Sequence, residues 1–287
     1  MTESRWEVRL MRLSNTALSL CLLAAIALPG FAQKKPVPAA KPAEPAVPTR
    51  VEFLRDVAPI LDRSGCSTAG CHGKFGGRGG LQISLLTLSP EDDYEPLVYG
   101  GRGRRINFVA PEKSLLLLKA TMGVAHAGGP RFAVGSQQYN TILKWIKAGA
   151  PFDDKDPRLV SLSISPEKVT LEKAHKPSPT MQSEPRQLTV TAIYTDGSQR
   201  NVTNQTSFQS TNDGVLEVSQ NGVVKGKRWG GGAILGRYLG TIVSSSITLP
   251  QDRKGAYPVI PASNVIDKFT LDNFKRLNVI QIGRAHV

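Results

Sequence analysis

The stretch Cys66-Ser-Thr-Ala-Gly-Cys71-His72 decides how the first half of the chain is interpreted. Two thiols, with an imidazole directly after the second, form the arrangement that attaches haem c. The thiols can add to the two haem vinyl groups, and the adjacent His can then ligate the iron. The usual spacing leaves two residues between the cysteines, whereas this chain has four, a less common variant. The sequence predicts one covalent haem c on Cys66 and Cys71, with His72 as an iron ligand.

Other interpretations of the two thiols stay open at this point. Both belong to a chain that is predicted to be exported, where a disulfide between Cys66 and Cys71 is permitted. They can also be two unrelated cysteines. A zinc site has less support, because only three candidate ligands cluster here and no second CxxC follows.

A low-spin haem needs a second axial ligand. The candidates outside the motif are Met122, His126, His175 and Met181. The last two lie in the part of the chain that is predicted to form strands. We favour His126 as the sixth ligand, with Met122 as the alternative. Two imidazoles favour ferric iron and a low potential, whereas a thioether raises the potential.

Cationic side chains are the natural partners of the haem propionates. Arg104 and Arg105 belong to the one tight basic cluster of the chain, and Lys119 follows in a Leu-rich helical segment. We predict propionate contacts for Arg104 and Arg105, with Lys119 as a further candidate. Ordinary surface charge is the alternative for all three.

The whole chain is basic, with 287 residues and a formal net charge of +13. A basic chain can bind nucleic acid, anionic membranes or acidic partners. Its basic residues are scattered, without a basic helix or interleaved aromatic residues. The pattern predicts a solvated basic surface and no nucleic-acid binding.

The N-terminus has the pattern of a signal peptide over residues 1–32. Arg5, Arg9 and Arg12 precede an apolar run at 17–28, and small residues lead up to Ala32. This predicts export to the periplasm, the medium or the cell surface, with an uncleaved membrane anchor as the alternative. Export is also where haem c is attached.

Two domains are predicted after a Pro- and Ala-rich linker at residues 33–49. Apolar spacing typical of helices occurs at 51–61, 114–122 and 137–148. A helix before the haem motif and another at the end are typical of a small all-α cytochrome c, which gives a domain at 50–152.

The following segment, 158–250, has the pattern of an all-β domain. Apolar and polar residues alternate at 187–194, which places Leu188, Val190, Ala192 and Tyr194 on one face. Turn signals recur about every ten residues, between short strands predicted at 162–166, 215–218, 222–224, 233–239 and 242–249. This predicts a β-sandwich, so the fold class is multidomain.

Two families resemble these segments. The first domain resembles the cytochrome c-like domain of planctomycete-type large secreted proteins, on Phe53-Leu-Arg-Asp-Val-Ala-Pro-Ile-Leu61, Cys66 to Gly73, Gly80-Leu-Gln-Ile-Ser-Leu-Leu86, Gly103-Arg-Arg105, Pro111-Glu-Lys-Ser-Leu-Leu-Leu-Leu-Lys119, His126-Ala-Gly-Gly129 and Trp145-Ile-Lys-Ala-Gly-Ala150. The second resembles the group 2 bacterial Ig-like domain, on Tyr194-Thr-Asp-Gly-Ser198, Asn201-Val-Thr203 and Asn221-Gly-Val-Val224. The resemblance implies a haem-binding module followed by a spacer or adhesive module.

An amphipathic helix is predicted near the C-terminus, within 263–281, with Ser263 as its N-cap. In the planctomycete-type family a similar helix opens a larger domain of unknown function, so we expect a truncated third domain. The last residues, 282–287, have the pattern of a non-native tail, so no fold or function is inferred from them.

Together these patterns predict an exported mono-haem electron-transfer module. The expected partners are an unidentified redox protein, a cell-surface or membrane-associated protein, and the haem-attachment machinery. The sequence contains no catalytic constellation, so we expect an electron carrier rather than an enzyme. The alternatives are a non-redox adhesive protein with a Cys66–Cys71 disulfide, and the electron-input module of a larger enzyme.

Overall fold

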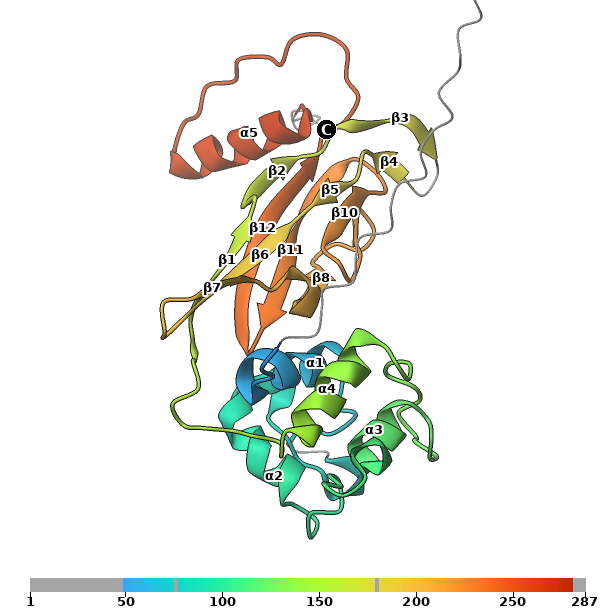
Figure 1. The fold of residues 1–287 in the computed structure, drawn as a ribbon. Helices are drawn as coiled ribbons and strands as arrows, with labels where there is room; N and C mark the ends of the chain where they lie inside the picture. Colours follow the sequence, from blue (N-terminus) through green and yellow to red (C-terminus); the bar gives the residue numbers. More distant parts are fainter. Residues whose placement is uncertain (1–48, 75–76, 179–180, 281–287) are drawn as a thin grey trace, which may run out of the picture. The chain divides into compact units, whose positions relative to one another are not determined.

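The computed structural model describes residues 49–280, except 75–76 and 179–180. The described residues fall in one compact unit, in which a helical region is followed by a β-rich region (Figure 1). The predicted signal peptide, almost all of the predicted linker and the predicted tail lie outside the described residues. None of the helices in the described part combines the length and the hydrophobicity that a membrane span needs.

The helical region contains the three predicted helices and one that was not predicted. A π-helical turn, Phe53–Val57, runs into α1, Ala58–Arg63. It is followed by α2 (Tyr94–Val98), α3 (Leu115–Ala120) and α4 (Gln137–Lys147). The side chain of Ser136 caps α4 by accepting a hydrogen bond from the amide of Tyr139. The short helix α2 has no apolar periodicity that would predict it, because it spans five residues and contains Pro96.

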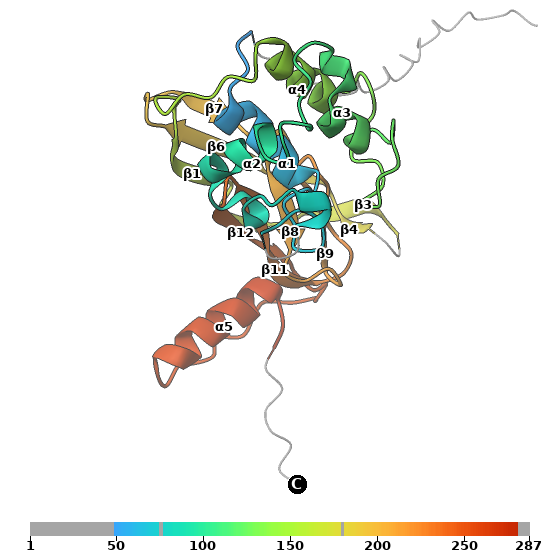
Figure 2. The same ribbon diagram turned by 90° about the horizontal axis from the view of Figure 1, so that it is seen from below.

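The core of this region joins the segment before the Cys motif to the last helix. Trp145 of α4 is fully buried and lies against Phe53, with ring centroids 5.5 Å apart. Its indole nitrogen donates to the carbonyl of Pro151 at 2.9 Å, so its one polar atom is satisfied. Figures 1 and 2 show α3 and α4 as neighbours. Packing against α4 therefore fixes the segment that leads into Cys66.

The β-rich region consists of several small, mostly antiparallel sheets with the strand orders β1-β6-β7, β5-β10-β9, β2-β12-β11-β8 and β3-β4. The pair β2–β12 is the parallel exception. The strands are β1 (Leu159–Ser165), β2 (Lys168–Thr170), β3 (Lys173–Ser178), β4 (Met181–Ser183), β5 (Arg186–Gln187), β6 (Thr189–Tyr194), β7 (Gln199–Asn201), β8 (Ser207–Ser210), β9 (Leu216–Val218), β10 (Val223–Gly226), β11 (Gly230–Tyr238) and β12 (Thr241–Leu249).

The alternation predicted for residues 187–194 is confirmed, since Leu188, Val190, Ala192 and Tyr194 are all buried. They share a core with side chains of other sheets, including Ile234 of β11 and Ile247 of β12. The hydroxyls of Tyr194 and Tyr238 lie 2.7 Å apart, so each buried phenol has a partner.

The C-terminal helix α5 spans Val265–Leu277 and confirms the predicted helix. The predicted N-cap was wrong by one residue. The side chain of Asn264, not of Ser263, accepts the hydrogen bond from the amide of Asp267. Asn and Ser are comparably good caps, so composition alone did not separate them.

Charged residues of the first helical segment contact the β-rich region. Arg55 lies 3.2 Å from Asp196, Asp56 lies 3.1 Å from Arg200, and Asp62 lies 3.0 Å from Arg237. Arg55, Asp56 and Asp62 are all buried. Since buried charges are costly unless they are paired, these ion pairs require the two regions to stay in contact. We call this set the charged interface.

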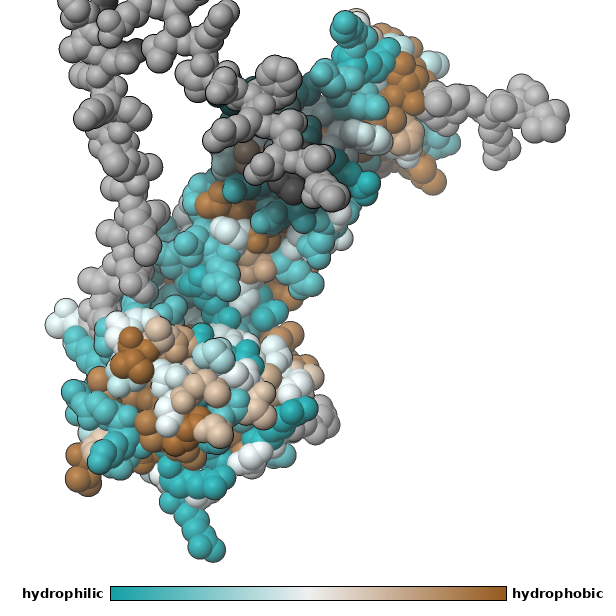
Figure 3. All heavy atoms as spheres, turned by 90° about the vertical axis from the view of Figure 1, so that its right-hand side faces the viewer, coloured by the Kyte–Doolittle hydropathy of each residue, from teal (hydrophilic) through white to brown (hydrophobic). Residues whose placement is uncertain are grey.

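The surface carries no large apolar face in the view of Figure 3, where polar side chains separate small apolar groups. Leu88, Val109 and Trp229 are among the exposed apolar side chains. Globular proteins expose such side chains singly as a matter of course, so these residues alone locate no site.

Candidate functional site

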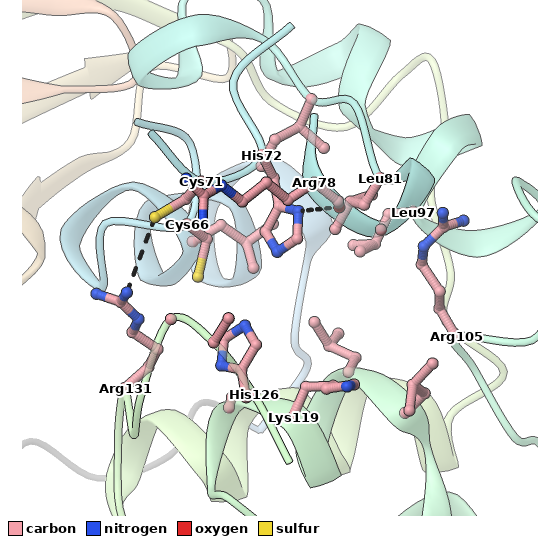
Figure 4. A pocket seen from close by; sticks show the side chains of 18 of the residues that line it. Cys66, Cys71, His72, Arg78, Leu81, Leu97, Arg105, Lys119, His126 and Arg131 are labelled. Carbon is pink, nitrogen blue, oxygen red and sulfur yellow. Dashed lines mark hydrogen bonds between the residues drawn. The ribbon is translucent and has the colours of Figure 1, made fainter. Parts of the chain in front are cut away.

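One cleft of about 520 Å³ in the helical region contains nearly all of the predicted site residues (Figure 4). The predicted residues that line it are Cys66, Cys71, His72, Arg104, Arg105, Lys119 and His126. Its apolar walls come from Leu61, Leu81, Ile83, Leu97, Leu115, Leu116 and Ala120. Met122 is not among the lining residues and its side chain is 45% exposed. His175 and Met181 lie on β3 and β4, outside the lining.

The loop that carries the two cysteines is closed by its own backbone. The amide of Cys66 donates to Leu61 at the end of α1, and the amide of His72 donates back to Cys66 at 3.0 Å. A Cβ on Gly73 would lie 2.9 Å from the carbonyl oxygen of Ser67, so no larger residue fits after His72. Both cysteines are free thiols. The turn thus places two thiols and one imidazole on the same cleft.

The two histidines face each other across the cleft (Figure 4). The rings of His72 and His126 are nearly parallel, at 5°, and their centroids lie 6.3 Å apart. Each Nδ1 lies 2.9 Å from a backbone carbonyl, of Arg78 for His72 and of Gly129 for His126. A carbonyl only accepts, so each Nδ1 donates, and in the neutral ring the lone pair then lies on Nε2.

Burial favours the neutral form of the first histidine. It lowers the pKa of His72, and the neighbouring His126 acts in the same direction. A neutral imidazole with a free Nε2 lone pair is the form that ligates a metal. A Cβ on Gly128 would lie 2.9 Å from Cε1 of His126 and 2.9 Å from Nη2 of Arg131, so a larger residue here would displace one of these side chains.

The thiols lie at one end of the cleft, beside the guanidinium of Arg131. Nη2 of Arg131 lies 3.8 Å from Sγ of Cys71, and its Nη1 lies 3.4 Å from the carbonyl of Ser64. Burial raises the pKa of the Cys66 thiol to about 11, although the charge of Arg131 acts against this shift. No sequence pattern marks Arg131, since it follows His126 in an irregular loop.

Figure 4 shows Arg105 on the side of the cleft away from the thiols. Its guanidinium is buried and donates to the carbonyls of Pro96 at 3.0 Å, Gly100 at 2.5 Å and Gly80 at 2.6 Å. Arg104 is exposed and donates to Gly79 at 3.0 Å. Arg105 therefore ties together the two Gly-rich loops that border the cleft, a role that its sequence position does not reveal.

Replacing Arg105 with Met is expected to lower the free energy of unfolding by about 3 kcal/mol, because three buried carbonyls lose a charged donor. Denaturant unfolding of the full chain measures this change. The matched control is Arg104→Met, which removes one exposed hydrogen bond and is expected to cost less than about 1 kcal/mol. Equal losses in both variants would contradict the structural role of Arg105.

The cleft lining contains Arg78, Arg104, Arg105, Lys119 and Arg131 but no acidic residue. In the described part of the chain, no three His, Cys, Asp or Glu side chains converge as ligands for a metal ion. The arrangement suits a flat, anionic ligand that the thiols can hold at one end and the imidazoles can hold from both faces. No protein-family model matches the chain, and no curated protein is significantly similar to it.

Proposed function

We propose that the cleft binds one haem c and that the chain is an exported one-electron carrier. The observation that carries this proposal is the pair of facing imidazoles beside two free thiols. Where a metal–imidazole bond is about 2 Å long, two rings bound to one ion from opposite sides have centroids roughly 6 Å apart. The separation of 6.3 Å between His72 and His126 fits this arrangement.

The remaining lining fits the same ligand. A volume of about 520 Å³ lies within the range of cofactor sites. Leu81, Ile83 and Leu97 offer apolar contact to a porphyrin face and exclude water. The cationic side chains offer partners for two propionates. Haem supplies reversible one-electron transfer, and the protein supplies attachment, ligands and a low dielectric.

Each residue has a distinct role in this proposal. Cys66 and Cys71 would hold the haem through thioether links. His72 and His126 would hold the iron through Nε2, while the carbonyls of Arg78 and Gly129 keep the rings in orientation. Arg104 and Lys119 would neutralise propionate charge. Two imidazole ligands favour a low reduction potential.

The finer fold assignments belong to the same proposal. We interpret the helical region as a small cytochrome c-like domain and the β-rich region as an Ig-like sandwich of the group 2 bacterial type. Three further predictions rest on the sequence motifs. They are the resemblance to planctomycete-type secreted proteins, the periplasmic or cell-surface location, and the redox partner protein.

Co-expression of the full chain with a bacterial haem-attachment system tests the proposal. We expect a product with a sharp Soret band and with haem that stays on the protein in acidified organic solvent. Dithionite and ferricyanide should convert it reversibly between two spectra. A colourless product with a Cys66–Cys71 disulfide would instead overturn the haem proposal and favour a non-redox role.

A further inference from the structure

The carboxylate of Asp62 lies where the loop of residues 64–72, which carries both cysteines and is called the Cys loop below, meets the charged interface. It is the second-last residue of α1, is 3% exposed, and accepts four hydrogen bonds. Arg237 of β11 donates to both of its oxygens, at 3.0 Å and 3.3 Å. Ser67 donates from the Cys loop at 3.2 Å, and Ser207 from β8 at 3.4 Å. One carboxylate therefore joins the loop to two strands of the β-rich region.

Ser67 is the residue through which the loop is held. It follows Cys66 and is fully buried. Besides its bond to Asp62, its hydroxyl accepts from Thr87 at 3.3 Å, and its carbonyl accepts from the amide of Leu86 at 3.0 Å. Buried hydroxyls are costly without partners, so these contacts hold Ser67 in one position and with it the neighbouring Cys66.

The four-residue spacing between the cysteines makes this anchor necessary. Ordering each backbone residue costs about 1–2 kcal/mol, so two extra residues add flexibility that contacts must offset. Ser67 supplies such contacts, whereas Ala69 and Gly70 are exposed. Asp62 can serve as the anchor only while its own charge is compensated, because a buried carboxylate without a cation is strongly unfavourable.

Arg237 supplies that cation from a rigid position. Its strand β11 pairs with β12 over nine residue pairs and with β8 on its other side. The forked guanidinium binds both carboxylate oxygens, which fixes direction as well as distance. The β-rich region of the same chain therefore supplies the cation on which the anchor of the Cys loop depends.

We propose that Asp62 is a positioning residue and that Arg237, acting through Asp62 and Ser67, fixes the loop that presents Cys66 and Cys71 to the cleft. The β-rich region is then part of the cofactor site and not only a spacer. This inference rests on the proposed function, which gives the Cys loop its purpose of holding haem. The contacts themselves are all between residues of this chain.

Hydrogen exchange in the full chain tests the proposal with a matched control. Arg237→Met removes the cation that compensates Asp62, whereas Arg200→Met breaks the ion pair with Asp56 elsewhere in the charged interface. The reporters are the amides of His72 and Leu86, which donate to the carbonyls of Cys66 and Ser67. We expect roughly tenfold faster exchange or more in Arg237→Met and little change in Arg200→Met.

Two further variants keep the test decisive if Arg237→Met folds poorly. Ser67→Ala removes only the hydroxyl and should speed exchange at the same two amides. Arg237→Lys keeps the charge but loses the fork, and should fall between Arg237→Met and the parent chain. Unchanged exchange in Ser67→Ala, or equal acceleration in Arg237→Met and Arg200→Met, would overturn the proposal.

The loaded chain gives a second readout. After co-expression with the attachment system, mass spectrometry should find more chains with a single thioether in Arg237→Met than in Arg200→Met. The absorption maximum of the pyridine haemochrome should shift toward that of a haem with one unreacted vinyl group. If the parent chain takes up no haem, the proposed function fails, while the exchange rates still decide the role of Asp62.

Discussion

The double variant Cys66→Ala/Cys71→Ala is expected to lose all covalently held haem. The thioethers are the only covalent links in the proposed site, whereas His72 and His126 can ligate iron without them. Haem that remains with the variant should therefore pass completely into acidified organic solvent. Haem staining after denaturing electrophoresis, together with that extraction, measures the change.

The two single variants are the controls for this result. Cys66→Ala and Cys71→Ala each leave one thiol on the cleft, so each should keep haem through one thioether. Both should keep the low-spin spectrum of the parent chain, because no ligand is removed. If haem extracts completely from the parent chain as well, covalent attachment is wrong.

The second large effect is expected for His126→Ala. The haem should stay attached, since both thioethers are untouched, but the iron should become five-coordinate and high-spin. It should then bind added cyanide or imidazole readily. The ring of His126 is the one that faces His72 across the cleft, and the lining contains no third histidine and no methionine that could take its place. Absorption and electron paramagnetic resonance spectra measure the change.

Met122→Ala is the matched control, because it removes the alternative ligand in the same loop. Met122 lies outside the cleft lining and is 45% exposed, so its removal should leave the spectrum unchanged. The opposite pattern would reverse the assignment: a long-wavelength ferric band of thioether ligation that is lost in Met122→Ala and kept in His126→Ala. It would also imply a higher potential.

The helices and many of the strands could be predicted because their apolar spacing is strong. The segments 137–148 and 187–194 carry such periodicity, and α4 and β6 occupy most of each. The sequence contained no comparable signal for α2 or for the short strands β2, β3 and β5, which have two to six residues. Elements this short owe their structure to tertiary contacts more than to local pattern.

The candidate site was predicted in part. The placement of Cys66, Cys71, His72 and His126 on one cleft follows from a motif and a position along the chain. Arg131 and Asp62 were missed, because their roles depend on contacts that no local pattern encodes. The pair Asp62–Arg237 joins residues 175 positions apart. For Arg105 the residue was predicted, but its three backbone acceptors could be found only in the structure.

The hydrogen bonds that orient the two imidazoles end on main-chain oxygens, those of Arg78 and Gly129. Every amino acid carries that oxygen, so substitution of the Arg78 side chain cannot delete the acceptor. Mutations can disturb the ring orientation by redirecting the backbone, as a side chain at Gly73 would do, or by pressing on the ring itself, as a side chain at Gly128 would do. Over evolutionary time, the orientation of both rings is thus robust to most point mutations around them, and purifying selection should concentrate on a few glycines.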